Sequence, residues 1–362
     1  MIVKSLTVAN FRNYKKEHIE FSEGTNVIYG NNAQGKTNLL EAVHLFASGK
    51  SHRTKSDSEL IKFGEEFMKI GIEFADKDRD YRAVMQIGSD LKKSVKINNV
   101  PVTKLSMLMR YLNVVMFSPW DLEIIKGAPQ MRRRFLDEAI SQLYPVYLKS
   151  LIDYHKNMAQ KNSLLKKLKF SGKTDDAMLS VWNSQIAECG SIIMEYRRDF
   201  LEKLNRYAGE IHREISGEKL RLVYTPSIDC EQISTENFLE KLESVKAREI
   251  ENGSSLYGIQ RDDIRFYIND NEVRTYASQG QQRTCVLSLK MAQMEHIREV
   301  REEYPVLLLD DIMSELDTTR RAYLANKIRG KQVIITCTDS DMVDTGDATR
   351  LFRVENGSVS RK

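Results

Sequence analysis

The chain has 362 residues and a formal net charge of +4, with apolar residues at 41% and charged residues at 29%. These proportions are typical of a folded globular protein and exclude a disordered chain, a collagen-like repeat or a disulfide scaffold. The small net charge gives no reason by itself to expect a nucleic-acid partner, so such a site must rest on local clusters. The length favours more than one compact part.

The sequence contains no apolar run long enough to span a membrane, and residues 1–6 alternate as in a strand instead of forming a charged and then apolar leader. We therefore expect a cytoplasmic protein. The cysteines are isolated along the chain and lack the paired spacing of a zinc site or redox dithiol, so we expect reduced, buried thiols. They are Cys189, Cys230, Cys285 and Cys337.

The N-terminal region predicts strands, a glycine-containing loop and a helix in that order. Residues 2–8, 18–21 and 25–29 have strand patterns, and an amphipathic helix is expected from Lys36 to Ala47. From Phe67 to Val102 the alternation of apolar and polar residues predicts antiparallel hairpins in the same lobe.

Helical periodicity dominates from about Pro129 to Ser216 and predicts an inserted helical arm. The stretch from Val181 to Ser216 lacks proline and permits a helix of roughly 50 Å at 1.5 Å per residue. The lysine-rich segment from Lys161 to Lys173, around Ser171 and Gly172, predicts an exposed turn between helices.

After Leu220 strands return, and the order of elements predicts a parallel-sheet lobe. The continuous apolar run from Pro305 to Asp310 suits a strand that is buried on both faces. The expected elements around it are a helix after Gln281, a helix over Thr319–Arg329, and strands over Gln332–Thr336 and Arg350–Val354.

Directly after the third strand, the sequence fits the phosphate-loop pattern G-x-x-x-x-G-K-T. Backbone N–H groups of such a loop surround phosphates, the lysine reaches the β- and γ-phosphates, and the threonine binds Mg²⁺. The alternative is an ordinary glycine turn. The residues are Gly30, Asn31, Asn32, Ala33, Gln34, Gly35, Lys36 and Thr37.

Two adjacent carboxylates, Asp310 and Asp311, end the buried strand. We assign Asp310 with Thr37 to the Mg²⁺ site, and Asp311 to orienting or deprotonating the attacking water. The alternative is a pair of helix N-cap residues. The long separation from Lys36 implies a large insertion, and the absence of an Asn-Lys-x-Asp segment favours ATP over GTP.

The segment from Ser278 through Gly280 and Gln281 to Arg283 resembles the signature sequence of ABC-type ATPases. Its serine, its glycine and a helix N-terminus can present donors to a γ-phosphate, although the same residues also suit a plain helix cap. The segment Ser314–Asp317 resembles the D-loop of those ATPases, and here too a helix start capped by Ser314 is the alternative.

Taken together, these segments resemble the RecF family of bacterial recombination-repair ATPases over most of the chain. The resemblance implies an α/β fold, an ABC/SMC-type P-loop ATPase head with a mixed sheet and an inserted α-helical arm, divided at residues 1–128, 129–219 and 220–362. The segments that carry it, besides the nucleotide motifs, are residues 8–14, 117–122, 126–129, 132–137 and 278–284.

In ABC and SMC-like ATPases, the signature segment contacts nucleotide held by another subunit. The resemblance thus implies an ATP-dependent homodimer in which Lys36, Asp311 and Ser278 serve catalysis, and Ser278, Gly280 and Gln281 complete the ATP site. It further implies binding to single- and double-stranded DNA, gaps and junctions, slow hydrolysis that releases the complex, and help to RecR and RecO in loading RecA. No membrane partner is implied.

Arginines and lysines in three clusters are candidates for DNA phosphates: Arg132, Arg133 and Arg134; residues 50–55 with Arg53; and the arm lysines. The alternatives are a solvated charged face or structural ion pairs. The chain departs from the family pattern at Ile259 and Gln260, where Pro-His is expected, and it lacks a switch histidine, for which Thr338 is the candidate replacement.

Two other functions fit parts of these patterns. A stand-alone nucleotide kinase or phosphotransferase would need an acceptor pocket and would turn over as a monomer. The head of an SMC-like structural protein would need a long heptad coiled coil, which the sequence lacks.

Overall fold

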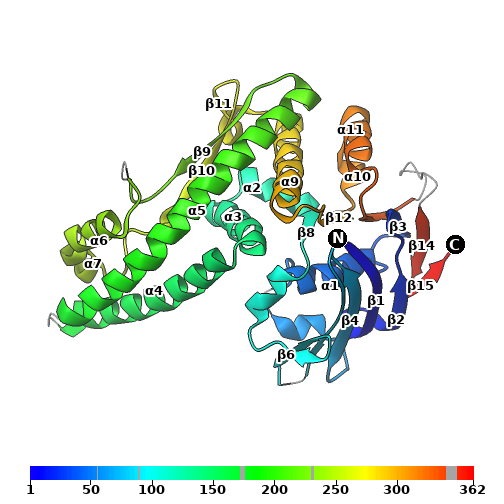
Figure 1. Ribbon diagram of the computed structural model, residues 1–362, viewed down its shortest axis with the longest axis horizontal. Helices are drawn as coiled ribbons and strands as arrows, with labels where there is room; N and C mark the ends of the chain where they lie inside the picture. The colour runs from blue at the N-terminus through cyan, green and yellow to red at the C-terminus, as the bar shows by residue number, and fades with distance from the viewer. Residues whose placement is uncertain (55, 89, 172–175, 230–231, 340–348) are drawn as a thin grey trace. The chain divides into compact units, whose positions relative to one another are not determined.

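The structure is a computed structural model that describes residues 1–54, 56–88, 90–171, 176–229, 232–339 and 349–362 (Figure 1). The chain divides into two compact units. The first comprises Met1–Leu122, Glu214–Gly217 and Arg283–Lys362, and the second comprises Glu123–Arg213 and Glu218–Gln282. The domain boundaries expected from the sequence stay a prediction. Among the residues named above, Lys55, Gly172, Lys173 and Cys230 lie outside the described residues.

One sheet of the first unit has the strand order β15-β14-β3-β13-β12-β8. All neighbours from β14 to β8 are parallel, whereas β14 and β15 are antiparallel. Strands β12 and β13 are buried at every residue, as their apolar runs predict for strands covered on both faces. The strands are β3 (Thr25–Tyr29), β8 (Val114–Phe117), β12 (Val306–Asp310), β13 (Val333–Cys337), β14 (Arg350–Glu355) and β15 (Ser358–Arg361).

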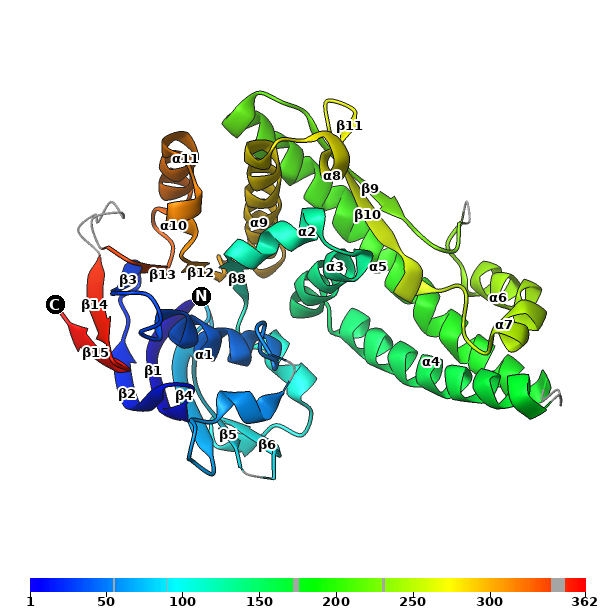
Figure 2. The same ribbon diagram turned by 180° about the vertical axis from the view of Figure 1, so that it is seen from behind.

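The other sheet of this unit is antiparallel, with the order β2-β1-β4-β5-β6-β7. Helix α1 (Lys36–Ser48) shares one apolar core with both sheets, since Leu40 packs in the same cluster as Ile70 and Leu308 (Figure 2). This shared core holds α1 against both sheets. The strands are β1 (Ile2–Phe11), β2 (Tyr14–Glu20), β4 (Met68–Ala75), β5 (Asp80–Ile87), β6 (Lys93–Ile97) and β7 (Val100–Pro101).

The first unit contains several further helices. The helix expected over residues 319–329 is present as α11 (Thr318–Ile328), and a short helix, α10 (Ile312–Glu315), directly follows the two carboxylates. Helix α9 (Gln279–Arg301) begins in the second unit, and its part from Arg283 onward belongs to the first. Three short 3-10 helices are η1 (Asp57–Leu60), η2 (Leu105–Arg110) and η3 (Pro119–Leu122).

The second unit contains the predicted helical arm and a small antiparallel sheet with the order β11-β10-β9. Its two long helices are α4 (Pro145–Ser171) and α5 (Asp176–Ser216). The last three residues of α5 belong to the first unit. The other elements are α2 (Glu123–Lys126), α3 (Pro129–Leu143), β9 (Leu220–Thr225), α6 (Thr235–Ser244), α7 (Lys246–Asn252), η4 (Ile259–Arg261), β10 (Asp263–Ile268), β11 (Asn271–Glu272) and α8 (Val273–Tyr276).

The expected exposed turn from Lys161 to Lys173 is wrong over most of its length. Helix α4 continues through Lys161 to Ser171, and the Lys161 side chain is fully buried against Glu249 of α7, with Nζ and Oε2 2.7 Å apart. A lysine run cannot reveal a buried ion pair whose partner is distant in sequence. Lys161 is therefore a structural residue of the arm and not a DNA contact.

Two further expectations concern thiols and membranes. Cys285 and Cys337 are buried and Cys189 is half-buried, and none of these three forms a disulfide. Within the described ranges, no helix is both long and apolar enough to cross a membrane.

Candidate nucleotide-binding site

The phosphate loop joins the end of β3 to the start of α1, as predicted. Gly30 has φ 149° and Gly35 has φ 110°, backbone conformations that favour glycine. A Cβ atom at Gly30 would lie 2.3 Å from the Val354 carbonyl oxygen, so β14 leaves no room for a side chain there. The loop thus turns sharply, and its N–H groups lie at the N-terminus of α1, where anions bind favourably.

The Lys36 side chain lies over this loop. Its Nζ donates to the carbonyl oxygens of Gly30 at 2.6 Å and Asn31 at 2.8 Å, and the residue is 7% exposed. Burial lowers the pKa of Lys36, and the negative charge of Asp311 opposes that shift. The ammonium group is thereby held in the concave side of the loop, where a phosphate chain would need it.

Thr37 and Asp310 meet, although they lie far apart in sequence. The Thr37 hydroxyl donates to Asp310 Oδ1 at 2.7 Å, and Asp310 is 6% exposed at the end of β12. Hydroxyl and carboxylate oxygens are the hard ligands that Mg²⁺ prefers. No group of three His, Cys, Asp or Glu side chains that could hold a metal occurs among the described residues. The oxygens of Thr37 and Asp310 fit a magnesium ion, and its other ligands would have to come from nucleotide phosphate and water.

Asp311 follows in an unusual backbone conformation at the start of α10. Its φ is 52°, and its N–H contacts both the Thr336 hydroxyl at 2.9 Å and the Thr336 carbonyl at 3.2 Å. Burial raises the pKa of Asp311, and the Lys36 charge opposes that rise. A carboxylate placed in this way beside the lysine can act on an attacking water. Lys36, Thr37, Asp310 and Asp311 thus form one site in the first unit.

Thr336 is a site residue that the sequence did not reveal. It is fully buried, and its hydroxyl donates to Asp310 Oδ1 at 2.8 Å while accepting from the Asp311 N–H. Strand β13 pairs in parallel with β12, with Thr336 opposite Asp310. The rule that ligands gather at the carboxyl ends of parallel strands was the available signal. Thr338, the candidate replacement for a switch histidine, is exposed beyond the end of β13.

The signature segment forms the cap of α9, in the second unit. Ser278 Oγ accepts from the Gln281 N–H at 3.2 Å, and the Gln281 side-chain oxygen accepts from the Ser278 N–H at 2.9 Å. This reciprocal pair is the capping arrangement that the sequence left open as an alternative. Ser278 is exposed, and Gly280 is half-buried in the first turn of α9. Capping therefore leaves the serine at the surface.

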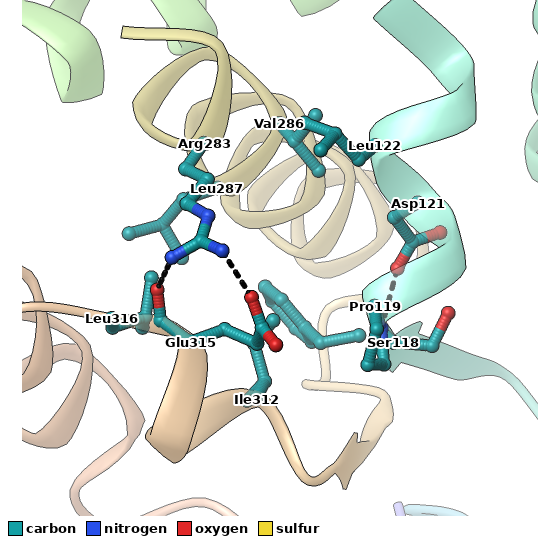
Figure 3. Close-up of a pocket in the computed structure, with 11 residues that line it drawn as sticks. Ser118, Pro119, Asp121, Leu122, Arg283, Val286, Leu287, Ile312, Glu315 and Leu316 are labelled. Atoms are coloured by element: carbon teal, nitrogen blue, oxygen red, sulfur yellow. Dashed lines mark hydrogen bonds and ion pairs between the residues drawn. The ribbon is translucent and has the colours of Figure 1, made fainter. Parts of the chain in front are cut away.

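The segment after Asp311 is tied to α9 within the first unit. Arg283 donates to both the carbonyl and the carboxylate of Glu315, as Figure 3 shows. Asp317, not Ser314, caps α11, because its side chain accepts from the Arg320 N–H at 2.9 Å. A cavity of about 40 Å³ lies beside the Arg283–Glu315 pair, with the end of β8 on its other side. The D-loop-like segment thus contacts the helix that begins with the signature.

Arg132 corrects the expected DNA cluster. Its side chain is 3% exposed, and its guanidinium forms a bidentate pair with Asp263 at 2.6 and 3.0 Å. A third nitrogen donates to the Gly127 carbonyl at 2.9 Å. These bonds occupy the guanidinium inside the second unit, so Arg132 is a structural residue and is not available to DNA phosphates.

The other candidate arginines differ in exposure. Arg133 is half-buried and donates to the Asp262 carbonyl at 2.8 Å, whereas the Arg134 side chain is 44% exposed and pairs with Glu138 on its own helix. In the first unit, the Arg53 side chain is 38% exposed and donates to Asn38 of α1 at 2.6 Å. Among the candidate arginines, Arg134 and Arg53 are the two whose exposure lets DNA reach them, and of the candidate lysines, Lys50, Lys166, Lys167 and Lys169 are exposed as well.

Two segments singled out by the resemblance pack together in the second unit. Arg197 of α5 is fully buried and pairs with Asp137 and Asp262, each at 2.8 Å. Gln260 is one of the two residues that differ from the family pattern. Its side-chain oxygen accepts from the Tyr154 hydroxyl, and its side-chain nitrogen donates to the Tyr257 carbonyl at 2.9 Å. These contacts explain why Asp262 and Arg197 can be buried: their charged groups pair with each other, and Asp137 pairs with the same arginine.

The sheet, the phosphate loop and the strand-end carboxylates define the head of an ABC/SMC-type ATPase. The sequence model of the family described as RecF/RecN/SMC N terminal domain matches residues 2–360. The curated protein "DNA replication and repair protein RecF" of Bacillus cereus (strain G9842) is 42% identical over 369 residues, covering 99% of this chain and 98% of its own. The counterpart in Bacillus thuringiensis (strain Al Hakam) matches equally. The chain belongs to this family and, within it, to the RecF proteins.

Solved structures agree. The structure of "the recombination mediator protein RecF-ATP in RecFOR pathway" superposes with a TM-score of 0.94 at 37% identity, covering 99% of this chain and 97% of that one. The Smc head domain of Pyrococcus furiosus gives a TM-score of 0.59 at 18% identity and covers 99% of this chain and 95% of its own, which shows the fold alone.

Proposed function

We propose that this protein is an ATP-driven switch in DNA repair and replication. The observation that carries the proposal is the convergence of Lys36, Thr37 and Asp310 at the end of a buried parallel strand. This arrangement supports binding of ATP with Mg²⁺, because the loop, the ammonium group and the hard oxygens match a phosphate chain and its metal. The metal, when bound, would neutralise charge on the phosphates.

The proposed reaction is slow hydrolysis of ATP. Asp311 would orient or deprotonate the attacking water, and Lys36 would stabilise charge on the phosphates. Ser278 with Gly280 and Gln281 would complete the site on another copy of the chain, which requires an ATP-dependent homodimer. The exposure of Ser278 supports this role, since its Oγ can accept and donate further hydrogen bonds while it caps α9.

The proposed partner is DNA, single- or double-stranded and at gaps or junctions. Two considerations support it: the relatives are described as DNA replication and repair proteins, and Arg53 and Arg134 present exposed guanidinium groups. The neighbouring structure is described as a recombination mediator in the RecFOR pathway. Because of that similarity, we propose RecR and RecO as protein partners in the cytoplasm. Through them, the protein would assist the loading of RecA.

DNA binding tests this proposal directly. We expect binding of gapped duplex that depends on ATP, weakens as salt rises, and is lost in Lys36→Met because that variant cannot hold the phosphates. Fluorescence anisotropy at several salt concentrations measures it. DNA binding that is the same with and without ATP would refute the switch. ATP turnover per chain that does not change with protein concentration would instead favour a monomeric nucleotide kinase or phosphotransferase.

A further inference from the structure

Gln34 and Gly35 of the phosphate loop accept three hydrogen bonds from two hairpins, one near each end of the chain. Asn13, in the turn between β1 and β2, donates its Nδ2 to the Gln34 carbonyl at 2.8 Å. Tyr14, the first residue of β2, donates its hydroxyl to the Gly35 carbonyl at 3.0 Å. The N–H of Asn356, between β14 and β15, donates to Gln34 Oε1 at 2.6 Å. All of these residues belong to the first unit.

Peptide geometry gives these contacts a consequence for phosphate binding. In a planar trans peptide, the carbonyl of one residue and the N–H of the next point in opposite directions. Holding the Gln34 carbonyl toward Asn13 therefore turns the Gly35 N–H the other way, and holding the Gly35 carbonyl toward Tyr14 does the same for the Lys36 N–H. Backbone N–H groups are the donors with which a phosphate loop surrounds its ligand. Asn13 and Tyr14 thus set the direction of two such donors.

Both side chains are themselves fixed. Asn13 Oδ1 accepts from Asn38 Nδ2 at 2.8 Å, and its backbone carbonyl accepts from Lys62 Nζ at 2.7 Å. A Cβ at Gly35 would lie 2.4 Å from Asn13 Nδ2, so the asparagine lies directly against the glycine. Tyr14 is fully buried. Neither side chain has to lose much freedom when the nucleotide binds, which is the condition for preorganised donors.

We propose that Asn13 and Tyr14 are positioning residues of the phosphate loop, acting on ligands that carry a β-phosphate, namely nucleoside di- and triphosphates. They hold the N–H groups of Gly35 and Lys36 toward the phosphate and do not contact it themselves. The inference rests on the proposed ATP site and adds to it a role for segment 8–14, which the nucleotide motifs leave unexplained.

The test compares Tyr14→Phe, which removes the hydroxyl alone, with Tyr81→Phe as the matched control. Tyr81 of β5 is a buried tyrosine of the same unit whose hydroxyl donates at 2.8 Å to Asp76, which lies in the turn between β4 and β5. We expect Tyr14→Phe to weaken ATP and ADP binding about three- to tenfold, as for loss of one oriented hydrogen bond. The Tyr81→Phe control should bind both nucleotides as the unaltered protein does. Titration with a fluorescent nucleotide, with melting temperatures of the nucleotide-free proteins, measures both.

The kinetics of ATP hydrolysis distinguish a variant with misdirected donors from a variant that is partly unfolded. Poorly directed donors raise KM for ATP while kcat at saturation changes by less than about twofold, whereas a smaller folded fraction lowers kcat and leaves KM unchanged. Asn13→Ala is the second variant, and we expect the same rise in KM from it. It keeps the inference testable if Tyr14→Phe does not fold. Unchanged nucleotide affinity in both variants, or a fall in kcat alone, would overturn the inference. Failure of the unaltered protein to bind ATP would instead overturn the proposed function.

Discussion

At the residue scale, the proposed binding of Mg²⁺ depends on the oxygens of Thr37 and Asp310, which lie 2.7 Å apart. Thr37→Val removes the hydroxyl and keeps the shape of the side chain. We expect Mg²⁺ to increase the ATP affinity of this variant far less than it increases that of the unaltered protein. ATP affinity measured with Mg²⁺ and again with EDTA checks this, and the ratio should fall about tenfold or more. Thr7→Val is the control, because the Thr7 hydroxyl hydrogen-bonds to His18 of β2 at 2.9 Å, within the antiparallel sheet. A full Mg²⁺ effect in Thr37→Val would contradict the assignment.

Arg132 and Arg134 are two residues apart yet differ in what their loss should do. Arg132→Gln leaves Asp263 without its bidentate partner, and we expect a loss of about 3 kcal/mol in the free energy of unfolding. Arg134→Gln breaks an exposed pair with Glu138 and should cost about 0.5 kcal/mol or less. Urea unfolding followed by circular dichroism compares them. Equal stability of the two variants would show that the Arg132–Asp263 pair contributes little.

At the residue scale, the sequence is most informative where the residues of a site are neighbours in the chain. The phosphate loop is one continuous segment, so its pattern specifies the turn, the lysine and the threonine together. Thr336 was missed because its partners Asp310 and Asp311 lie on the neighbouring strand, and Arg132 was misassigned because a run of three arginines does not show which one is buried. Burial and pairing across the chain decide both cases.

The Arg283–Glu315 pair belongs to the scale of elements, because it joins α9 to α10 (Figure 3). We expect Arg283→Gln to loosen α10, which begins directly after Asp311, and to lower kcat for ATP hydrolysis about three- to tenfold without changing ATP affinity. Arg298→Gln is the control, since Arg298 pairs with Glu295 on the same helix and is half-exposed. Hydrolysis and equilibrium binding of ATP are measured for both. An unchanged kcat in Arg283→Gln would exclude this connection from the reaction.

Helices and strands were predicted best where apolar residues recur at regular spacing or form a continuous run. Helix α1 and strands β12 and β14 lie close to their expected bounds, because apolar spacing determines them. Helix α4 was interrupted too early in the prediction, since the lysines that suggested a turn include Lys161, whose partner Glu249 lies on α7. A local pattern cannot anticipate a pair that tertiary packing brings together.

At the scale of the whole molecule, each unit contributes different parts of the proposed reaction. The first holds the phosphate loop and both carboxylates, and the second carries Ser278 at the start of α9. The sequence predicted both segments and their order, and the family resemblance alone supplied the idea that they act in different copies of the chain. The proposed dimer therefore cannot be inferred from contacts within one chain.

Sedimentation velocity tests whether ATP joins two copies of the chain. The protein is measured without nucleotide, with ATP and with a non-hydrolysable ATP analogue, each with and without DNA. We expect a monomer without nucleotide, a dimer with the analogue, and a dimer that dissociates as ATP is consumed. Ser278→Arg should bind ATP and remain monomeric, because the new side chain occupies the surface where the other copy's nucleotide would lie. A stable Ser278→Arg protein that dimerises normally would contradict the shared site.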